Sequence, residues 1–124
     1  MLIRQLASGS RGEISVHVDE TGRCEVLDFI ERLSERDLKR VLSLLRLFCD
    51  QGEIRNEEKF QHEEDKIYAF KSFQVRILCT FLPTTGKRLV VLLHAFRKKK
   101  SPLSKSDLKK AKLLSDSVNG TAGG

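Results

Sequence analysis

A basic constellation with a single histidine lies in the second half of the chain. Arg76 sits inside an apolar segment, Lys71 ends the segment before it, and His94 lies near the end of the segment after it. Arg97 and the run Lys98–Lys100 follow directly. Cleavage of RNA needs a base for the 2′-hydroxyl, cations for the charge on the phosphorane and an acid for the leaving 5′-oxygen. Histidine can act as base or acid near neutral pH, and arginine can hold phosphate oxygens in a bidentate fork.

Each of these groups also has a purely structural interpretation. His94 lies in a mostly apolar segment, where a histidine is commonly a hydrogen-bonded core or edge residue. Arg76 could instead form an ion pair with the acidic segment Glu57–Asp65, and the lysine run could be a solvated turn. The acidic segment itself could hold an acid–base pair, although unpaired carboxylates are normally solvated.

The remaining aromatic residues and the cysteines predict core packing. We expect Tyr68, Phe73 and Phe96 to be core residues and not platforms on which bases stack. The cysteines are far apart and odd in number, which fits neither a disulfide framework nor a zinc spacing. We expect buried thiols in a reducing compartment, at Cys24, Cys49 and Cys79. The sequence also lacks a phosphate-binding glycine loop, so it predicts no metal and no cofactor.

Charge is distributed unevenly along the 124 residues, whose formal net charge is +6. Residues 1–66 contain 11 basic and 15 acidic side chains, whereas residues 67–124 contain 12 basic and 2 acidic side chains. A basic half of this kind favours an anionic partner, with nucleic acid as the first candidate, although a solvated lysine-rich surface explains it equally well.

Apolar periodicity predicts a strand and two helices in the first half. Residues 14–18 alternate between apolar and polar side chains, which predicts a half-buried strand that ends in a turn at Asp19–Gly22. A short helix is expected over Val26–Leu33. A second helix is expected to begin after Ser34, with Asp37 in a capping-box pattern, and to stop at Gly52.

The second half predicts a meander of strands followed by a helix. We expect residues 53–66 to form a polar loop, and the strands to cover 67–70, 73–81 and 89–96, with a turn over 83–87. The last strand is apolar on both faces, which predicts a central position. Ser104 and Asp107 then form a capping-box pattern before a basic helix. The predicted class is α+β, with the N-terminal helices on one face of a small antiparallel sheet and a C-terminal helix.

These residues resemble the phage-derived branch of the RelE/HigB-type toxins. The resemblance rests on three segments of the basic half and covers roughly residues 12–116; the segments are Ile67–Lys71, Phe73–Leu78 and Val90–Lys100. The segment Val26–Leu33 matches more weakly. The resemblance implies a microbial-RNase-like fold, cleavage of mRNA in the ribosomal A site, and neutralisation by a cognate antitoxin that is often a helix-turn-helix protein.

Individual roles are carried over from that family residue by residue. The resemblance implies that Arg76 binds phosphate, that Lys98 and Lys99 are the paired lysines of the site, and that His94 is the histidine beside them. Lysines and an arginine around them are expected to bind RNA, namely Lys71, Arg97, Lys100, Lys105 and Lys109. Lys71 stands where the family has arginine, which keeps the charge but loses the bidentate fork, and the tyrosine common in the last helix is absent.

Three functions therefore follow as hypotheses. The first is a ribosome-dependent mRNA endoribonuclease, the toxin of a type II toxin–antitoxin system, whose partners are mRNA, ribosomal RNA and the antitoxin. The second is a non-catalytic RNA- or ribosome-binding module, or an inactive toxin homologue. The third is a protein-interaction module that uses the helices of residues 26–51. We expect a single domain over residues 1–118 with a disordered tail over 119–124, no signal peptide or membrane span, and a cytoplasmic location.

Overall fold

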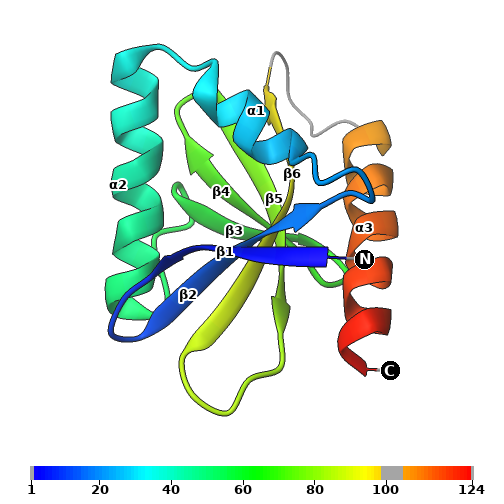
Figure 1. Cartoon of the computed structure of the whole chain (residues 1–124). Coiled ribbons are helices and arrows are strands. Elements are labelled where there is room, and N and C mark those ends of the chain that lie inside the picture. The colour runs from blue at the N-terminus through cyan, green and yellow to red at the C-terminus, as the bar shows by residue number, and fades with distance from the viewer. Residues whose placement is uncertain (1, 99–104, 124) are drawn as a thin grey trace.

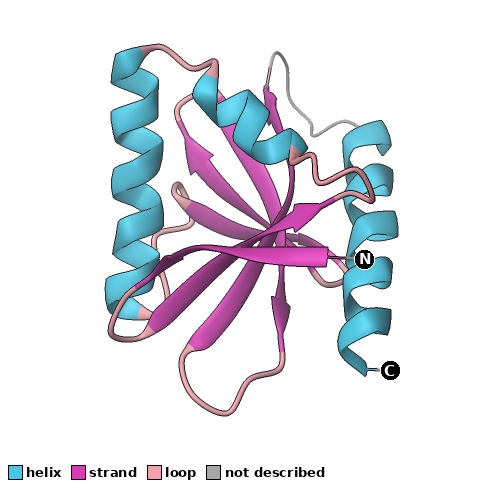
Figure 2. Ribbon diagram, in the orientation of Figure 1, coloured by secondary structure: helices cyan, strands magenta, loops and turns pink. Residues whose placement is uncertain are grey.

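The fold is a six-stranded sheet with helices on both faces (Figures 1 and 2). The computed structural model describes residues 2–98 and 105–123, and only the backbone of residues 2 and 120–123. The strands are β1 (Leu2–Ser8), β2 (Gly12–Val18), β3 (Phe60–Glu64), β4 (Ile67–Ser72), β5 (Val75–Leu82) and β6 (Arg88–Arg97). The helices are α1 (Glu25–Glu31), α2 (Glu35–Gln51) and α3 (Lys105–Gly123).

The strand order is β1-β2-β6-β5-β4-β3, so β6 is central, as its apolar residues predicted. The pairs are antiparallel except β2 with β6, which run parallel with Ile14 opposite Val90. The α+β class and the β4–β5–β6 meander are therefore confirmed. The parallel pair was not predicted, because no short-range turn signal marks a pairing between strands so far apart in the chain.

Two hydrophobic clusters lie on opposite faces of the sheet. On one face α1 and α2 pack through Ile30, Val41 and Phe48 against strand residues such as Ile77. On the other face α3 packs through residues such as Ala111 against alternate strand residues. The N-terminal helices thus lie together on one face, as predicted, and α3 covers the central strand from the other face.

Local signals set the ends of the helices as predicted. The Ser34 hydroxyl accepts a hydrogen bond from the backbone N–H of Asp37 at 3.2 Å, which caps α2. Gly52 ends α2 with a φ of 77°, a left-handed conformation that favours glycine. The three cysteines are buried free thiols, as expected. Ser104, the first residue of the second capping-box pattern, lies outside the described residues.

Three sequence predictions were wrong. The loop expected over residues 53–66 contains the edge strand β3, which was missed because its outward side chains are polar. The strand β1 at the other edge was also missed. Phe73 is not a core residue, since 67% of its side chain is exposed. Phe96 and Tyr68 are half-buried and pack on the core. The boundary between a domain over 1–118 and a tail over 119–124 stays a prediction, although α3 is helical as far as Gly123.

Candidate functional site

A row of three side chains crosses the sheet at the end where β4 and β6 finish and β5 begins. Lys71 of β4 pairs with Arg76 of β5, and Arg76 pairs with Phe96 of β6. Residues that pair directly across neighbouring strands project to the same face. This is the face that α3 covers farther along the strands, because Leu78, two residues after Arg76, packs in the α3 cluster. The meander therefore aligns two cations and one aromatic ring on this face.

The Arg76 guanidinium is anchored to the hairpin that carries it. Its Nη1 donates hydrogen bonds to the carbonyl oxygens of Phe73 at 2.5 Å and of Val75 at 3.0 Å. Partial burial lowers the pKa of Arg76 and the nearby Glu63 opposes this, but an arginine stays protonated. Among the described residues Arg76 makes no direct ion pair with the acidic segment, although Glu63 of that segment acts on its charge at longer range. These two bonds occupy Nη1 of the guanidinium, and Nη2 can donate a hydrogen bond to an added acceptor.

His94 lies on the same face as the row, two residues before Phe96 in β6. Its ring stacks on that of Phe96 with 5.4 Å between centroids. Nε2 lies 2.7 Å from Oδ1 of Asp107 in α3, and Nδ1 lies 3.3 Å from Oε1 of Glu25 in α1. Only 8% of His94 is exposed. The imidazole is therefore a buried hub that connects the central strand to two helices.

The carboxylate of Glu25 extends this hub to the surface. Lys110 Nζ lies 2.6 Å from one of its oxygens and 2.7 Å from the other. Burial opposes the ionisation of Glu25, but the hydrogen bond and charge of Lys110 and the charge of His94 outweigh it, so the pKa of Glu25 is lowered. Sequence reasoning missed this cluster, because Asp107 fitted a capping box and Glu25 is distant in the chain; no spacing signal connects them.

The other predicted residues are only partly gathered at the row. Lys98 follows β6, and its backbone N–H donates to the carbonyl of Gln74 at 2.7 Å, which places it beside the β4–β5 hairpin. Arg97 lies on the opposite face of the sheet and forms an ion pair with Asp37 at 3.2 Å. Lys105 and Lys109 are exposed in the first turns of α3. Lys99 and Lys100 lie outside the described residues.

Lys71 contributes its charge from a fixed position. Its Nζ donates to Oε1 of Gln61 on the edge strand at 2.6 Å. Both Lys71 and Arg76 are thus held by uncharged acceptors, and their positive charges are not neutralised by these contacts. A row that keeps its charge can attract the phosphates of a nucleic acid.

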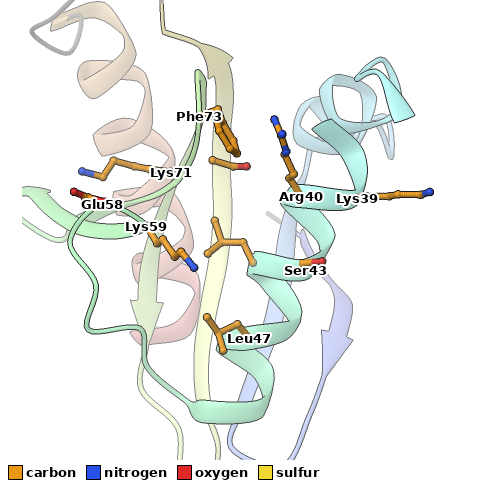
Figure 3. Close-up of a pocket in the computed structure, with 10 residues that line it drawn as sticks. Lys39, Arg40, Ser43, Leu47, Glu58, Lys59, Lys71 and Phe73 are labelled. Carbon is orange, nitrogen blue, oxygen red and sulfur yellow. The ribbon is translucent and has the colours of Figure 1, made fainter. Parts of the chain in front are cut away.

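A second feature that the sequence did not reveal is the exposed ring of Phe73. Phe73 occupies the two-residue turn between β4 and β5 with a φ of 55°. The guanidinium carbon of Arg40 lies 3.8 Å from the centroid of its ring, on the α2 side of the sheet. Figure 3 shows Phe73 and Arg40 facing each other across the space between the hairpin and α2.

Neither a metal-ligating cluster nor a membrane-spanning helix is found in the residues that the structure describes. No group of three or more His, Cys, Asp and Glu side chains there is arranged to hold a metal ion. None of the described helices is long and apolar enough to cross a bilayer.

Comparison with known proteins identifies one matching family model. Residues 28–115 match the model described as phage derived protein Gp49-like (DUF891). The match begins in α1 and ends in α3, so it includes β3 to β6 and the row formed by Lys71, Arg76 and Phe96. No curated protein matches the chain.

Proposed function

The chain belongs to the Gp49-like family of phage-derived proteins, which is associated with toxin–antitoxin systems, and we propose that it is the toxin of a type II system that cleaves mRNA on the ribosome. In this proposal it acts as an endoribonuclease of the RelE/HigB type in the cytoplasm. Its partners are mRNA, ribosomal RNA and a cognate antitoxin with a helix-turn-helix domain. The finer assignments rest on the sequence resemblance and on the chemistry of the sheet row.

The observation that carries the proposal is the alignment of Lys71, Arg76 and Phe96 across three strands. A single RNA strand is held by cations along its phosphates, which Lys71 and Arg76 supply, whereas Phe96 packs on the core and offers a base only the exposed part of its ring. Arg76 is the central phosphate ligand in this arrangement, and Lys71 and Lys98 flank it. The predicted Lys99 and Lys100 follow Lys98 directly in the chain.

The reaction is transesterification within the RNA. The 2′-oxygen attacks the adjacent phosphorus while a base takes its proton, and the bond from phosphorus to the 5′-oxygen breaks while an acid protonates that oxygen. The products are a 2′,3′-cyclic phosphate and a 5′-hydroxyl. Arg76 stabilises the charge that develops on the phosphorane oxygens. His94 is our predicted acid–base group, and its burial adds the condition that Asp107 must move away from Nε2 before RNA can reach it.

The burial of His94 favours a second candidate function, in which the protein is a non-catalytic RNA- or ribosome-binding module. Both ring nitrogens of His94 lie near carboxylates, and the side chain is almost inaccessible. If His94 serves only to hold α1 and α3 against the sheet, the row keeps its cations but lacks an acid–base group. Binding without cleavage would then be the activity that remains.

The test is induced expression in a bacterial host with mapping of mRNA 5′ ends on ribosomes. The wild type is compared with Arg76→Ala and with Arg55→Ala, an exposed arginine that pairs with Glu53 and is not part of the row. Growth arrest with new cuts in translated messages, lost only in Arg76→Ala, supports the proposed endoribonuclease. Binding to ribosomes without cuts, lost in Arg76→Ala, supports the second function. Neither cuts nor binding from a folded protein contradicts both.

A further inference from the structure

A groove runs between α2 and the β3–β4 side of the sheet, on the face that α2 covers (Figure 3). Its volume is about 480 Å³. From α2 it is lined by Lys39, Arg40, Ser43, Leu44 and Leu47, and from the opposite side by Glu58, Lys59, Lys71, Ser72 and Phe73. Of the row, Lys71 alone borders the groove, and its side chain points away from it, with Nζ bonded to Gln61 (Figure 3). The proposed RNA cleavage uses no other side chain that lines this groove.

The side chain of Phe73 does not serve the turn in which it lies. A left-handed φ is costly for a bulky residue, and asparagine or glycine is the usual choice there. Two thirds of the ring is exposed, so burial does not compensate for the strain. Strained residues with exposed side chains cluster at binding surfaces. The contact with Arg40 holds the ring at the mouth of the groove, and the exposed side of the ring is available to a ligand.

The groove combines an apolar floor with a basic rim. Leu44 is buried at its floor, and Leu47 and Phe73 are two of the five large hydrophobic side chains exposed in the described chain. Four of its lining residues are basic and only Glu58 is acidic, although the Nζ of Lys71 is turned away from the groove to Gln61. Figure 3 shows Lys59 pointing into the groove and Lys39 pointing outward from its far side. An apolar face with acidic flanks matches this surface.

We propose that the groove docks an acidic amphipathic helix of a partner protein, laid alongside α2. The leucines of such a helix would pack on Leu47 and Phe73, and its carboxylates would face Arg40 and Lys59. RNA fits the floor less well, because phosphates gain nothing from leucine side chains. The identification of this partner as the antitoxin rests on the proposed function, whereas the chemistry of the docked helix does not.

The probe is a synthetic amphipathic peptide of about 18 residues, or five helical turns, with leucines on one face. Three versions carry Glu, Gln or Lys beside the leucines. Each is titrated into the isotope-labelled full-length protein, and amide chemical shifts are followed by NMR. We expect the Glu peptide to bind, with shifts at Leu47, Lys59 and Phe73, the Gln peptide to bind about tenfold more weakly, and the Lys peptide not to bind.

Variants connect the binding to the groove. Phe73→Asn relieves the backbone strain, so the variant folds, and Lys59→Glu reverses one rim charge; each is expected to raise the Kd of the Glu peptide about tenfold. Leu113→Ala is the matched control, since Leu113 is an exposed leucine on α3. It is expected to leave the Kd within about twofold.

Several outcomes would overturn the proposal. These are no binding of the Glu peptide, equal binding of the Lys peptide, an unchanged Kd in Phe73→Asn, or shifts confined to the neighbouring groove at Leu6 and Leu42. Displacement of the Glu peptide by a single-stranded RNA, with the same shifts, would assign the groove to nucleic acid instead. The titration involves neither ribosomes nor cleavage. A negative toxin assay therefore does not affect the result of the titration. A negative titration does not affect the chemistry proposed for the row.

Discussion

Nε2 of His94 lies 2.7 Å from Oδ1 of Asp107, and this contact joins the central strand of the sheet to the first turn of α3. The carboxylate holds the ring from one side, and Glu25 of α1 approaches it from the other. A single imidazole thus connects three elements that are distant in the chain. The same residue is the predicted acid–base group, so its structural and chemical roles must be separated by experiment.

His94→Ala is expected to lower the free energy of unfolding by about 2 kcal/mol, because it leaves Asp107 without its hydrogen-bond partner and Glu25 with Lys110 alone in a partly buried site. Urea denaturation followed by circular dichroism measures this. His94→Gln, which retains a hydrogen-bond donor for Asp107, should recover part of the loss. A variant as stable as the wild type would show that the hub contributes nothing to the fold. If His94→Gln restores stability but not cleavage, the imidazole acts in the chemistry.

Arg76→Lys is expected to reduce cleavage about tenfold, and Arg76→Ala by about a hundredfold or more, because lysine retains the charge but not the bidentate fork. The rate is measured on a ribosome-bound message by primer extension. Arg97→Ala is a discriminating comparison, because Arg97 lies on the opposite face of the sheet in an ion pair with Asp37. A loss in Arg97→Ala equal to that in Arg76→Ala would contradict the assignment of the site to the α3 face.

Phe73→Asn is expected to raise Tm by about 3 °C, since relief of the left-handed strain, about 1 kcal/mol net of the lost contact with Arg40, stabilises the native state. Thermal unfolding by calorimetry checks this. Phe73→Leu keeps the strain and loses the ring, so its Tm should fall. A lower Tm in Phe73→Asn would mean that the contact of the ring with Arg40 stabilises the fold by more than the left-handed strain costs.

Glu25 predicts how stability depends on pH. The pKa of Glu25 in the folded protein lies below the usual 4.5. Its contribution to the free energy of unfolding is therefore fully present above pH 4.5, and it is lost as the pH falls through the lowered pKa. Glu25→Gln should therefore flatten the decline in Tm below pH 4.5. Lys109→Ala, a change to a neighbouring exposed lysine, should leave the wild-type profile intact. Parallel acid profiles for the wild type and Glu25→Gln would contradict the assigned pKa shift.

Much of the site could be predicted from the sequence, because its strands are consecutive and their turns are short. The β4–β5–β6 meander fixes the pairing of Lys71 with Arg76 once the hairpin between them is recognised. The face occupied by His94 could not be predicted. Leu78 pairs with His94 and Cys79 with Leu92, so Leu93 is an extra residue in β6. This bulge turns His94 toward α3, and a strand that is apolar on both faces carries no signal of it.

The groove beside α2 could not be predicted either. Leu47 is an apolar residue of the amphipathic helix α2, so the sequence favours its burial. Only tertiary packing determines which side of the apolar stripe of α2 contacts another element. Phe73 is apolar and adjoins an apolar strand, so composition favours the core, whereas the register of the hairpin puts it in the turn. Edge strand β3, which could have located the groove, has a single apolar anchor in Phe60 and too little alternation to be detected.

The parallel pairing of β2 with β6 has a consequence for the synthesis of the protein. β2 pairs at once with β1, but its second hydrogen-bonding partner exists only when Arg88–Leu92 of β6 has been made. The N-terminal segments therefore cannot join the rest of the sheet while they are being translated, and closure of so long a loop is slow. The β4–β5–β6 meander, in contrast, needs only short turns and can form without β2.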